Sequence, residues 1–276
     1  MNYQEFNFNI YNTEFYGQYW QPTKTKAVIV LVHGMGEHAS RYADYVIPKL
    51  TENHFGVIAF DQFGHGKTTG KRGHCPSFEA VLESVDQVIE KAKSVFGAIP
   101  LFLYGHSMGG NVVINYALRK DHNLKGVIAT SPFLKLAFIP PAWKMTLGKI
   151  MQKIAPSITL NNELNSDDIS KDLTEVQKYN NDPLMHNKVS PNFSLTFIET
   201  GKWAIENASQ LNTPTFIVHG SEDKIIDYKG SVEFSNNSKK TTHKIYENGY
   251  HELHNDLCKE KVLFDIIYWL NEITKK

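Results

Sequence analysis

The amino-acid sequence predicts an α/β protein in which helices cover both faces of a mostly parallel, doubly wound sheet. Two observations support this fold class. Apolar runs of strand length recur without the alternation of a half-exposed strand, and amphipathic helical patterns separate them. We expect residues 1–131 and 212–276 to form the core and residues 132–211 to form an inserted helical cap, because the alternation of strand and helix stops there.

The strand pattern begins with an expected antiparallel hairpin at the edge of the sheet. Residues 6–10 alternate between apolar and polar side chains, and residues 13–20 could return as the partner strand. Unbroken apolar runs then predict buried parallel strands at 27–32, 56–60, 100–104, 124–129 and 214–218. A further strand-like segment follows at 242–246. The carboxyl ends of parallel strands lie at one edge of a sheet, so the polar segments after these runs should converge.

The clearest helical pattern begins after Ser77, a favourable N-cap residue, and stops at Gly97. Its apolar positions share one face: Phe78, Val81, Leu82, Val85, Val88, Ile89 and Ala92. Residues 262–270 form a second helical pattern near the C-terminus.

One stretch of the expected cap has apolar residues at helical spacing: Trp143, Leu147, Ile150, Met151 and Ile154. Lys149 and Lys153 stand one turn apart on another face. Two interpretations remain open. The apolar residues could pack the cap onto the sheet, which is the commoner role of such a stripe, or the helix could rest on a lipid interface.

The composition narrows the class of function. Lys and Arg equal Asp and Glu at 29 residues each, so the net charge does not favour a nucleic-acid partner, and we expect none. No apolar run approaches the roughly 18 residues of a membrane span, and we expect a cytoplasmic protein. If the lipid interpretation of the cap helix holds, its membrane contact is expected to be transient. Cys75 and Cys258 fit neither a disulfide framework nor a metal site, and we expect no metal and no cofactor.

The segment around Ser107 is the most informative in the chain. Gly105-His106-Ser107-Met108-Gly109 follows the strand expected at 100–104 and precedes a helix-like stretch at 111–118. This is the G-x-S-x-G pattern of a nucleophile elbow in its strand-turn-helix setting, where glycines permit close backbone contacts and the serine is lifted out of the sheet and exposed. The alternative is a chance turn.

A serine nucleophile needs a general base and an acid that orients the base. The chain order for such an elbow is serine, acid, histidine. Asp223 follows the strand at 214–218 and His251 follows the segment at 242–246, so we select these two residues. The rivals are Glu222 and Asp227 for the acid, and His243 and His254 for the base, with His243 expected on the surface of its strand.

Attack on a carbonyl creates an oxyanion, which requires two donors. One expected donor is the N–H of Met108, directly after the nucleophile. The other should come from the loop at 33–38, whose glycines let the backbone approach a substrate, and we assign it to the N–H of Met35. The alternative for this loop is a plain β-turn.

Three other motifs do not support a site. Gly66-Lys67-Thr68 lacks the glycine that a phosphate loop requires five residues earlier, where Asp61 stands. His251 and His254 are three residues apart, whereas the zinc motif H-E-x-x-H spaces its histidines four apart. Asp61 precedes no elbow, and we expect the loop 61–66 to brace the sheet edge.

Six segments occur in a characteristic order: 33–38 with Arg41 and Tyr42, 61–66, 105–110, the cap segment 181–184, 220–223 and 250–254. Together they resemble the monoglyceride lipases and lysophospholipase-like serine hydrolases of the α/β-hydrolase fold. The resemblance implies a catalytic triad of Ser107, Asp223 and His251, with Met35 and Met108 as oxyanion donors. It also implies that three residues contact the polar head of a substrate: Glu37, Arg41 and His254.

We therefore expect a cofactor-independent carboxylic ester hydrolase for a mono-acyl lipid. Monoacylglycerol is the first choice and lysophospholipid the second, because an apolar cap over a polar-lipped site suits one chain and one small head group. The same triad would serve a thioesterase, an amidase or an acyltransferase. The alternative from another class is a catalytically silent α/β-hydrolase that acts as a binding module.

Overall fold

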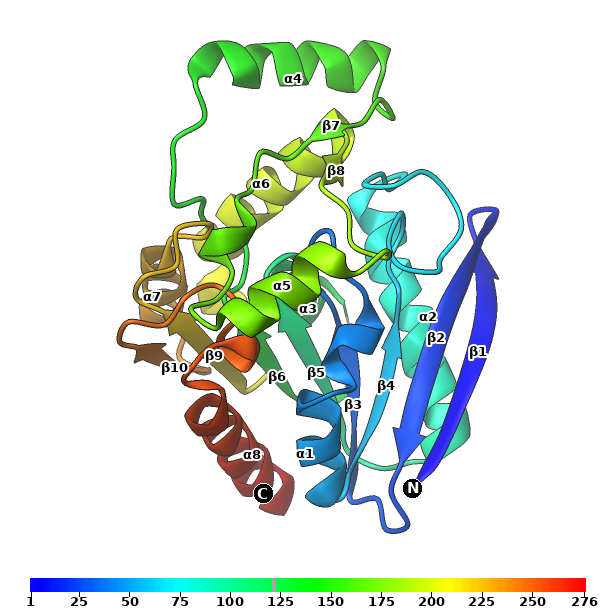
Figure 1. Cartoon of the computed structure of the whole chain (residues 1–276). Helices are drawn as coiled ribbons and strands as arrows, with labels where there is room; N and C mark the ends of the chain where they lie inside the picture. Colours follow the sequence, from blue (N-terminus) through cyan, green and yellow to red (C-terminus); the bar gives the residue numbers. More distant parts are fainter. Residues whose placement is uncertain (121–122) are drawn as a thin grey trace.

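A computed structural model describes residues 1–120 and 123–276, and it shows a central sheet with helices on both faces (Figure 1). Within these residues the sheet has eight strands in the order β1-β2-β4-β3-β5-β6-β9-β10. The strands are β1 (Asn2–Ile10), β2 (Thr13–Gln21), β3 (Ala27–Val32), β4 (Phe55–Phe60), β5 (Leu101–His106), β6 (Leu124–Thr130), β9 (Thr215–Gly220) and β10 (Thr241–Tyr246). Along the sheet from β4 to β10, each pair of neighbouring strands is parallel, whereas β1 and β2 pair antiparallel. The predicted fold class is therefore confirmed.

The helices of the core divide between the two faces of the sheet. They are α1 (Val46–Glu52), α2 (Phe78–Phe96), α3 (Met108–Arg119), α7 (Tyr228–Asn237) and α8 (Lys259–Lys275). One apolar cluster joins the sheet to α2, α3 and α7, and a second joins it to α1 and α8. Helices on both faces explain why the central strands are apolar without alternation.

The start of α2 confirms Ser77 as the predicted N-cap residue of this helix. The Ser77 side chain accepts a hydrogen bond from the Ala80 N–H at 3.1 Å, and the helix ends at Gly97, which has a φ of 77°. An N-cap of this kind satisfies one of the backbone donors that the first helical turn leaves free.

The segment between β6 and β9 contains three α-helices and a short ribbon. They are α4 (Ala142–Ile154), α5 (Leu173–Asn181), α6 (Pro191–Glu206), β7 (Leu160–Asn161) and β8 (Lys188–Val189), with 3-10 turns at Ser166–Asp168 and Ala208–Gln210. Phe193 and Phe197 of α6 belong to the same apolar cluster as the sheet, whereas α4 lies far from it (Figure 1). The division of the chain at 131 and 211 therefore stays a prediction.

The helix expected around Trp143 is present as α4, but its apolar stripe does not pack onto the sheet. Trp143, Leu147, Ile150 and Ile154 are between 49% and 73% exposed, and the helix has no buried residue. The interpretation that this stripe packs the cap onto the core is wrong. The reason is that α4 approaches its neighbour α6 through another side, where Leu195 lies against Gly148.

Across the described part of the chain, none of the helices is both long and apolar enough to cross a bilayer.

Candidate active site

The carboxyl edge of the sheet gathers the residues that the sequence selected. Ser107 follows β5, the loop 33–38 follows β3, Asp223 follows β9 and His251 follows β10. Strands β3 and β5 are neighbours at the point where the strand order reverses. Ligands of open parallel sheets bind in the crevice at such a switch point.

The backbone at Ser107 has the strained geometry of a nucleophile elbow. Its φ is 52° and its ψ is −114°, a region that residues with a side chain rarely adopt. The two flanking glycines are required by close approach, because a Cβ at Gly105 would lie 2.2 Å from the Gly109 carbonyl oxygen and one at Gly109 would lie 2.0 Å from that of Val32. The Ser107 N–H donates to the Thr130 carbonyl at 2.9 Å and fixes the turn to β6.

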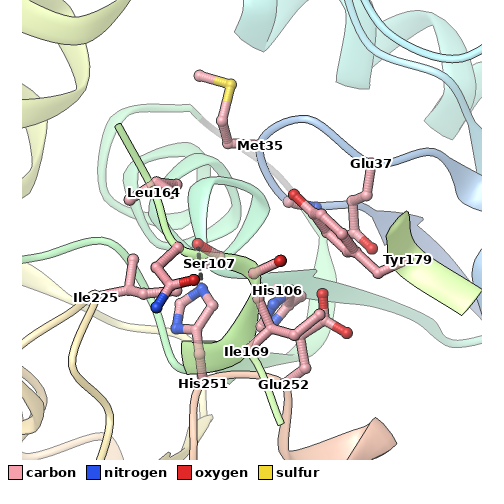
Figure 2. A pocket seen from close by; sticks show the side chains of 13 residues that line it. Met35, Glu37, His106, Ser107, Leu164, Ile169, Tyr179, Ile225, His251 and Glu252 are labelled. Carbon is pink, nitrogen blue, oxygen red and sulfur yellow. Dashed lines mark hydrogen bonds between the residues drawn. The ribbon is translucent and has the colours of Figure 1, made fainter. Parts of the chain in front are cut away.

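Ser107 is less exposed than the sequence predicts. Its exposed fraction is 7%, because residues of the segment between β6 and β9 lie over it. Leu164 and Ile169 come from that segment and line the pocket above the serine (Figure 2). The elbow lifts the hydroxyl out of the sheet, and this covering layer shields it from bulk water.

A chain of two hydrogen bonds joins the three predicted side chains. The Ser107 Oγ lies 2.9 Å from the His251 Nε2, and the His251 Nδ1 lies 2.6 Å from the Asp223 Oδ2. An ionised carboxylate only accepts, so the Nδ1 carries the proton and the Nε2 accepts from the serine hydroxyl. Figure 2 shows the side chains of Ser107 and His251 facing one another beside the pocket.

Asp223 is held as a buried carboxylate. Its Oδ1 accepts from the N–H groups of Ile225 and Ile226 at 2.9 Å each, and its Oδ2 accepts from His219 at 3.0 Å. Burial raises the pKa of Asp223, but His251 and His219 outweigh it and hold the pKa well below its usual value. Burial in turn lowers the pKa of His251, yet the Asp223 carboxylate outweighs that effect and holds the pKa above its usual value.

His219 is a supporting residue that the sequence does not reveal. Its Nδ1 accepts from the Ser231 hydroxyl at 2.8 Å while its Nε2 donates to Asp223, which adds a donor to a buried anion. The only signal is its position four residues before Asp223 at the end of β9, which does not distinguish it from any other strand residue.

The rival residues lie elsewhere. Glu222 is exposed and pairs with Lys171, and the Asp227 side chain caps α7 by accepting from the Lys229 N–H at 3.0 Å. His243 is exposed on β10, as predicted. Asp61 accepts from the backbone N–H groups of Ala39 and Lys67 at 2.8 Å each, so it braces two loops at the sheet edge as predicted.

The sequence predicts two oxyanion donors, the backbone N–H groups of Met35 and Met108. Met108 is the first residue of α3, where the N–H groups and the helix dipole favour an anion. The loop that holds Met35 runs past the serine, because a Cβ at Gly34 would lie 3.3 Å from the Ser107 Cβ. Within residues 1–120 and 123–276, neither the Met35 nor the Met108 N–H donates to a protein acceptor.

The pocket over Ser107 has an apolar side and a polar side. Its apolar side chains are Met35, Leu164, Ile169 and Ile225, and its polar ones include Glu37, Tyr179 and Glu252 (Figure 2). Of the three residues expected to contact a head group, only Glu37 lines this pocket. The Arg41 side chain is 8% exposed and forms ion pairs with two carboxylates. His254 is buried, and its ring centroid lies 4.8 Å from that of Tyr42.

The mostly parallel sheet and the elbow after β5 define the class of this protein, because this combination is that of an α/β-hydrolase. The comparisons with known proteins agree. The chain belongs to the Hydrolase_4 family, described as serine aminopeptidase, S33, which matches residues 23–258. It is an enzyme of the serine esterase and lipase class.

Several relatives and solved structures are similar over most of the chain. The monoglyceride lipase of Homo sapiens is 32% identical over 93% of this chain and 86% of that protein. The crystal structure of the Paleococcus ferrophilus monoacylglycerol lipase is 31% identical, with a TM-score of 0.85 over 99% of this chain and all of that one. An abhydrolase domain-containing protein of Dictyostelium discoideum is 37% identical over 92% of this chain, which spans only 27% of that protein.

Proposed function

We propose that this chain hydrolyses the ester of a mono-acyl lipid, with monoacylglycerol cleaved to glycerol and a fatty acid as the first choice. The observation that carries the proposal is the hydrogen-bonded chain from Ser107 through His251 to Asp223 at a pocket with one apolar and one polar side. The monoglyceride lipases among the relatives support the choice of substrate.

In the first half of the reaction, the Ser107 Oγ attacks the ester carbonyl carbon while the His251 Nε2 takes its proton. Asp223 holds the imidazole in the required tautomer and stabilises the imidazolium that forms. The N–H groups of Met35 and Met108 bind the oxyanion in a site that excludes most water. When the tetrahedral intermediate collapses, the carbon–oxygen bond to glycerol breaks and His251 returns the proton to the leaving oxygen.

In the second half, water repeats the sequence on the acyl-enzyme. His251 removes a proton from the water as its oxygen attacks the acyl carbon, and collapse breaks the bond to the Ser107 Oγ. The serine regains its proton from His251 and the fatty acid leaves. The side chains of the triad therefore end the cycle as they began it, and no cofactor enters any step.

The lining of the pocket supports a single acyl chain joined to a small polar group. Leu164, Ile169 and Ile225 form a wall that an acyl chain can cover, while Glu37 and Tyr179 present oxygens on the other side. A thioesterase would use the same triad, so only the preferred substrate distinguishes a thioesterase from an ester hydrolase. A panel of p-nitrophenyl esters, monoacylglycerols and acyl-CoA should show the highest kcat/KM among the lipid substrates for monoacylglycerol, and preference for the thioester would contradict the choice.

The experiment that tests the mechanism is Ser107→Ala. We expect kcat for ester hydrolysis to fall by about 10⁴- to 10⁶-fold, because the attacking oxygen is lost. The matched control is Ser157→Ala, which changes an exposed serine in the loop after α4 and should leave kcat unchanged. Hydrolysis by Ser107→Ala within a few-fold of the original protein would overturn the mechanism.

We also propose that α4 rests transiently on a lipid interface. Its four exposed apolar side chains have no protein layer over them, and Lys149 and Lys153 are exposed on the same helix. An amphipathic helix with basic residues on its polar face lies in the headgroup region of a bilayer. Such contact would bring the pocket close to the membrane in which a monoacylglycerol resides.

A further inference from the structure

A buried cluster of three charged side chains lies beside the site. The Arg41 Nη1 donates to the Glu37 Oε2 at 2.9 Å and to the Glu252 Oε1 at 2.7 Å, and its Nη2 donates to the Glu252 Oε2 at 2.9 Å. Each of the three side chains is 8% exposed or less. The Tyr179 ring covers the guanidinium, with its centroid 5.1 Å from the Arg41 Cζ.

One end of this cluster holds the loop after β3. The Glu37 Oε1 accepts from the Gly34 N–H at 2.5 Å and from the Tyr42 hydroxyl at 2.8 Å. Gly34 immediately precedes Met35, whose N–H is a proposed oxyanion donor. The carboxylate of Glu37 therefore fixes the peptide next to that donor.

The other end holds the loop after β10. Glu252 immediately follows His251, and its Oε2 also accepts from the Asn255 side chain at 2.8 Å. The backbone N–H of Glu252 donates to the Ile169 carbonyl at 2.7 Å. Arg41 thus joins the residue after the proposed general base to the carboxylate that fixes the loop of Met35.

The energetics argue for a positioning role. A buried ion cluster pays a large desolvation cost, and apolar replacements of the same shape are often as stable, so stability alone is a poor explanation for it. The bidentate contact between Arg41 and Glu252 restricts distance and angle together, which a single point charge cannot do. Three of the five N–H donors of Arg41 go to carboxylates, and its side chain does not line the pocket, which argues against contact with a head group.

We propose that Arg41 is a positioning residue that, through Glu37 and Glu252, sets the distance between the oxyanion amide of Met35 and the imidazole of His251. This inference rests on the proposed function, because it assigns Arg41 to the same reaction. It replaces the expectation that Arg41 contacts the polar head of the substrate.

The test compares two esters that differ in head group. Monoacylglycerol has a glycerol head, and p-nitrophenyl butyrate has none. In Arg41→Met and Glu252→Gln we expect kcat to fall by the same factor for both esters, about 10- to 100-fold, with KM within about two-fold, because the misplacement affects the reacting atoms. Arg41→Lys keeps the charge without the fork and should restore part of kcat.

The control is Glu206→Gln, which makes the same exchange as Glu252→Gln at an exposed carboxylate of α6 and should leave both constants unchanged. Thermal melting of each variant reports folding, and Glu252→Gln provides the comparison if Arg41→Met does not fold. A rise in KM for monoacylglycerol alone would show a head-group contact and overturn the proposal, as would unchanged kcat for both esters. If Ser107→Ala remained active, the proposed function itself would fail, which is a separate result.

Discussion

At the scale of single residues, Asp223 is central to the electrostatics of the site. It is a buried anion with donors on both oxygens, and it is the largest cause that raises the pKa of His251. Other titratable groups near His251 are Glu252 and Glu37, which raise its pKa further, His106, whose ring centroid lies 4.9 Å away, and His254. Burial keeps the pKa of His106 well below its usual value, so that ring is neutral.

This arrangement predicts the pH dependence of the enzyme. Activity requires neutral His251, so kcat/KM should fall as the pH drops through its raised pKa. In Asp223→Asn the imidazolium loses its carboxylate, so the pKa falls and the acid limb of the profile should move to lower pH. We expect kcat to fall as well, by about 10³- to 10⁴-fold, because the amide favours the wrong tautomer.

The matched control for this profile is Asp227→Asn, the rival acid that caps α7. Its kcat/KM profile should overlay that of the original protein. An acid limb that stays in place in Asp223→Asn would show that Asp223 does not act on His251.

The sequence identified some of these residues and missed others for a physical reason. Ser107, Asp223 and His251 follow strand ends, and a motif or the chain order selects them. His219 carries no signal that separates it from other residues of a strand end, although its partner Asp223 is only four residues away. Glu252 lies in the segment 250–254, but its role depends on Arg41, which lies 211 positions before it. The burial of Arg41 was missed for the same reason.

At the scale of elements, the strands were easier to predict than the cap. The run at 27–32 matches β3 at both ends, since a strand buried on both faces must be apolar throughout. A helix around Trp143 was also predicted and is present as α4, but the sequence left open whether its apolar stripe is packed or exposed. An amphipathic stripe shows that a helix has an apolar face, and it does not show what that face contacts.

The exposed face of α4 leads to a test of membrane docking. We expect the double variant Trp143→Gln and Leu147→Gln to co-sediment less with vesicles of neutral and anionic phospholipid, because it removes apolar surface from the interface. The control is Phe264→Gln, which changes an exposed aromatic residue of α8. Unchanged co-sedimentation of the double variant would rule out docking through this helix.

At the scale of the whole molecule, the fold brings together residues that are distant in sequence. Ser107 and His251 are 144 positions apart, yet they share a hydrogen bond because β5 and β10 end at the same edge of one sheet. The parallel order of the strands made this convergence predictable from the sequence. How the segment between β6 and β9 covers the site was not predictable in detail, since its apolar patterns do not show which neighbours they contact.

The most direct test of the account is labelling with a fluorophosphonate, which reacts with an activated serine. Mass spectrometry of the labelled peptides should place the phosphonate on Ser107 alone. The rate of labelling should fall by about 100-fold or more in His251→Ala, because the general base is lost. The control is His243→Ala, which alters the exposed histidine of β10 and should leave the rate unchanged. Modification of a different residue, or an equal rate in His251→Ala, would contradict the account.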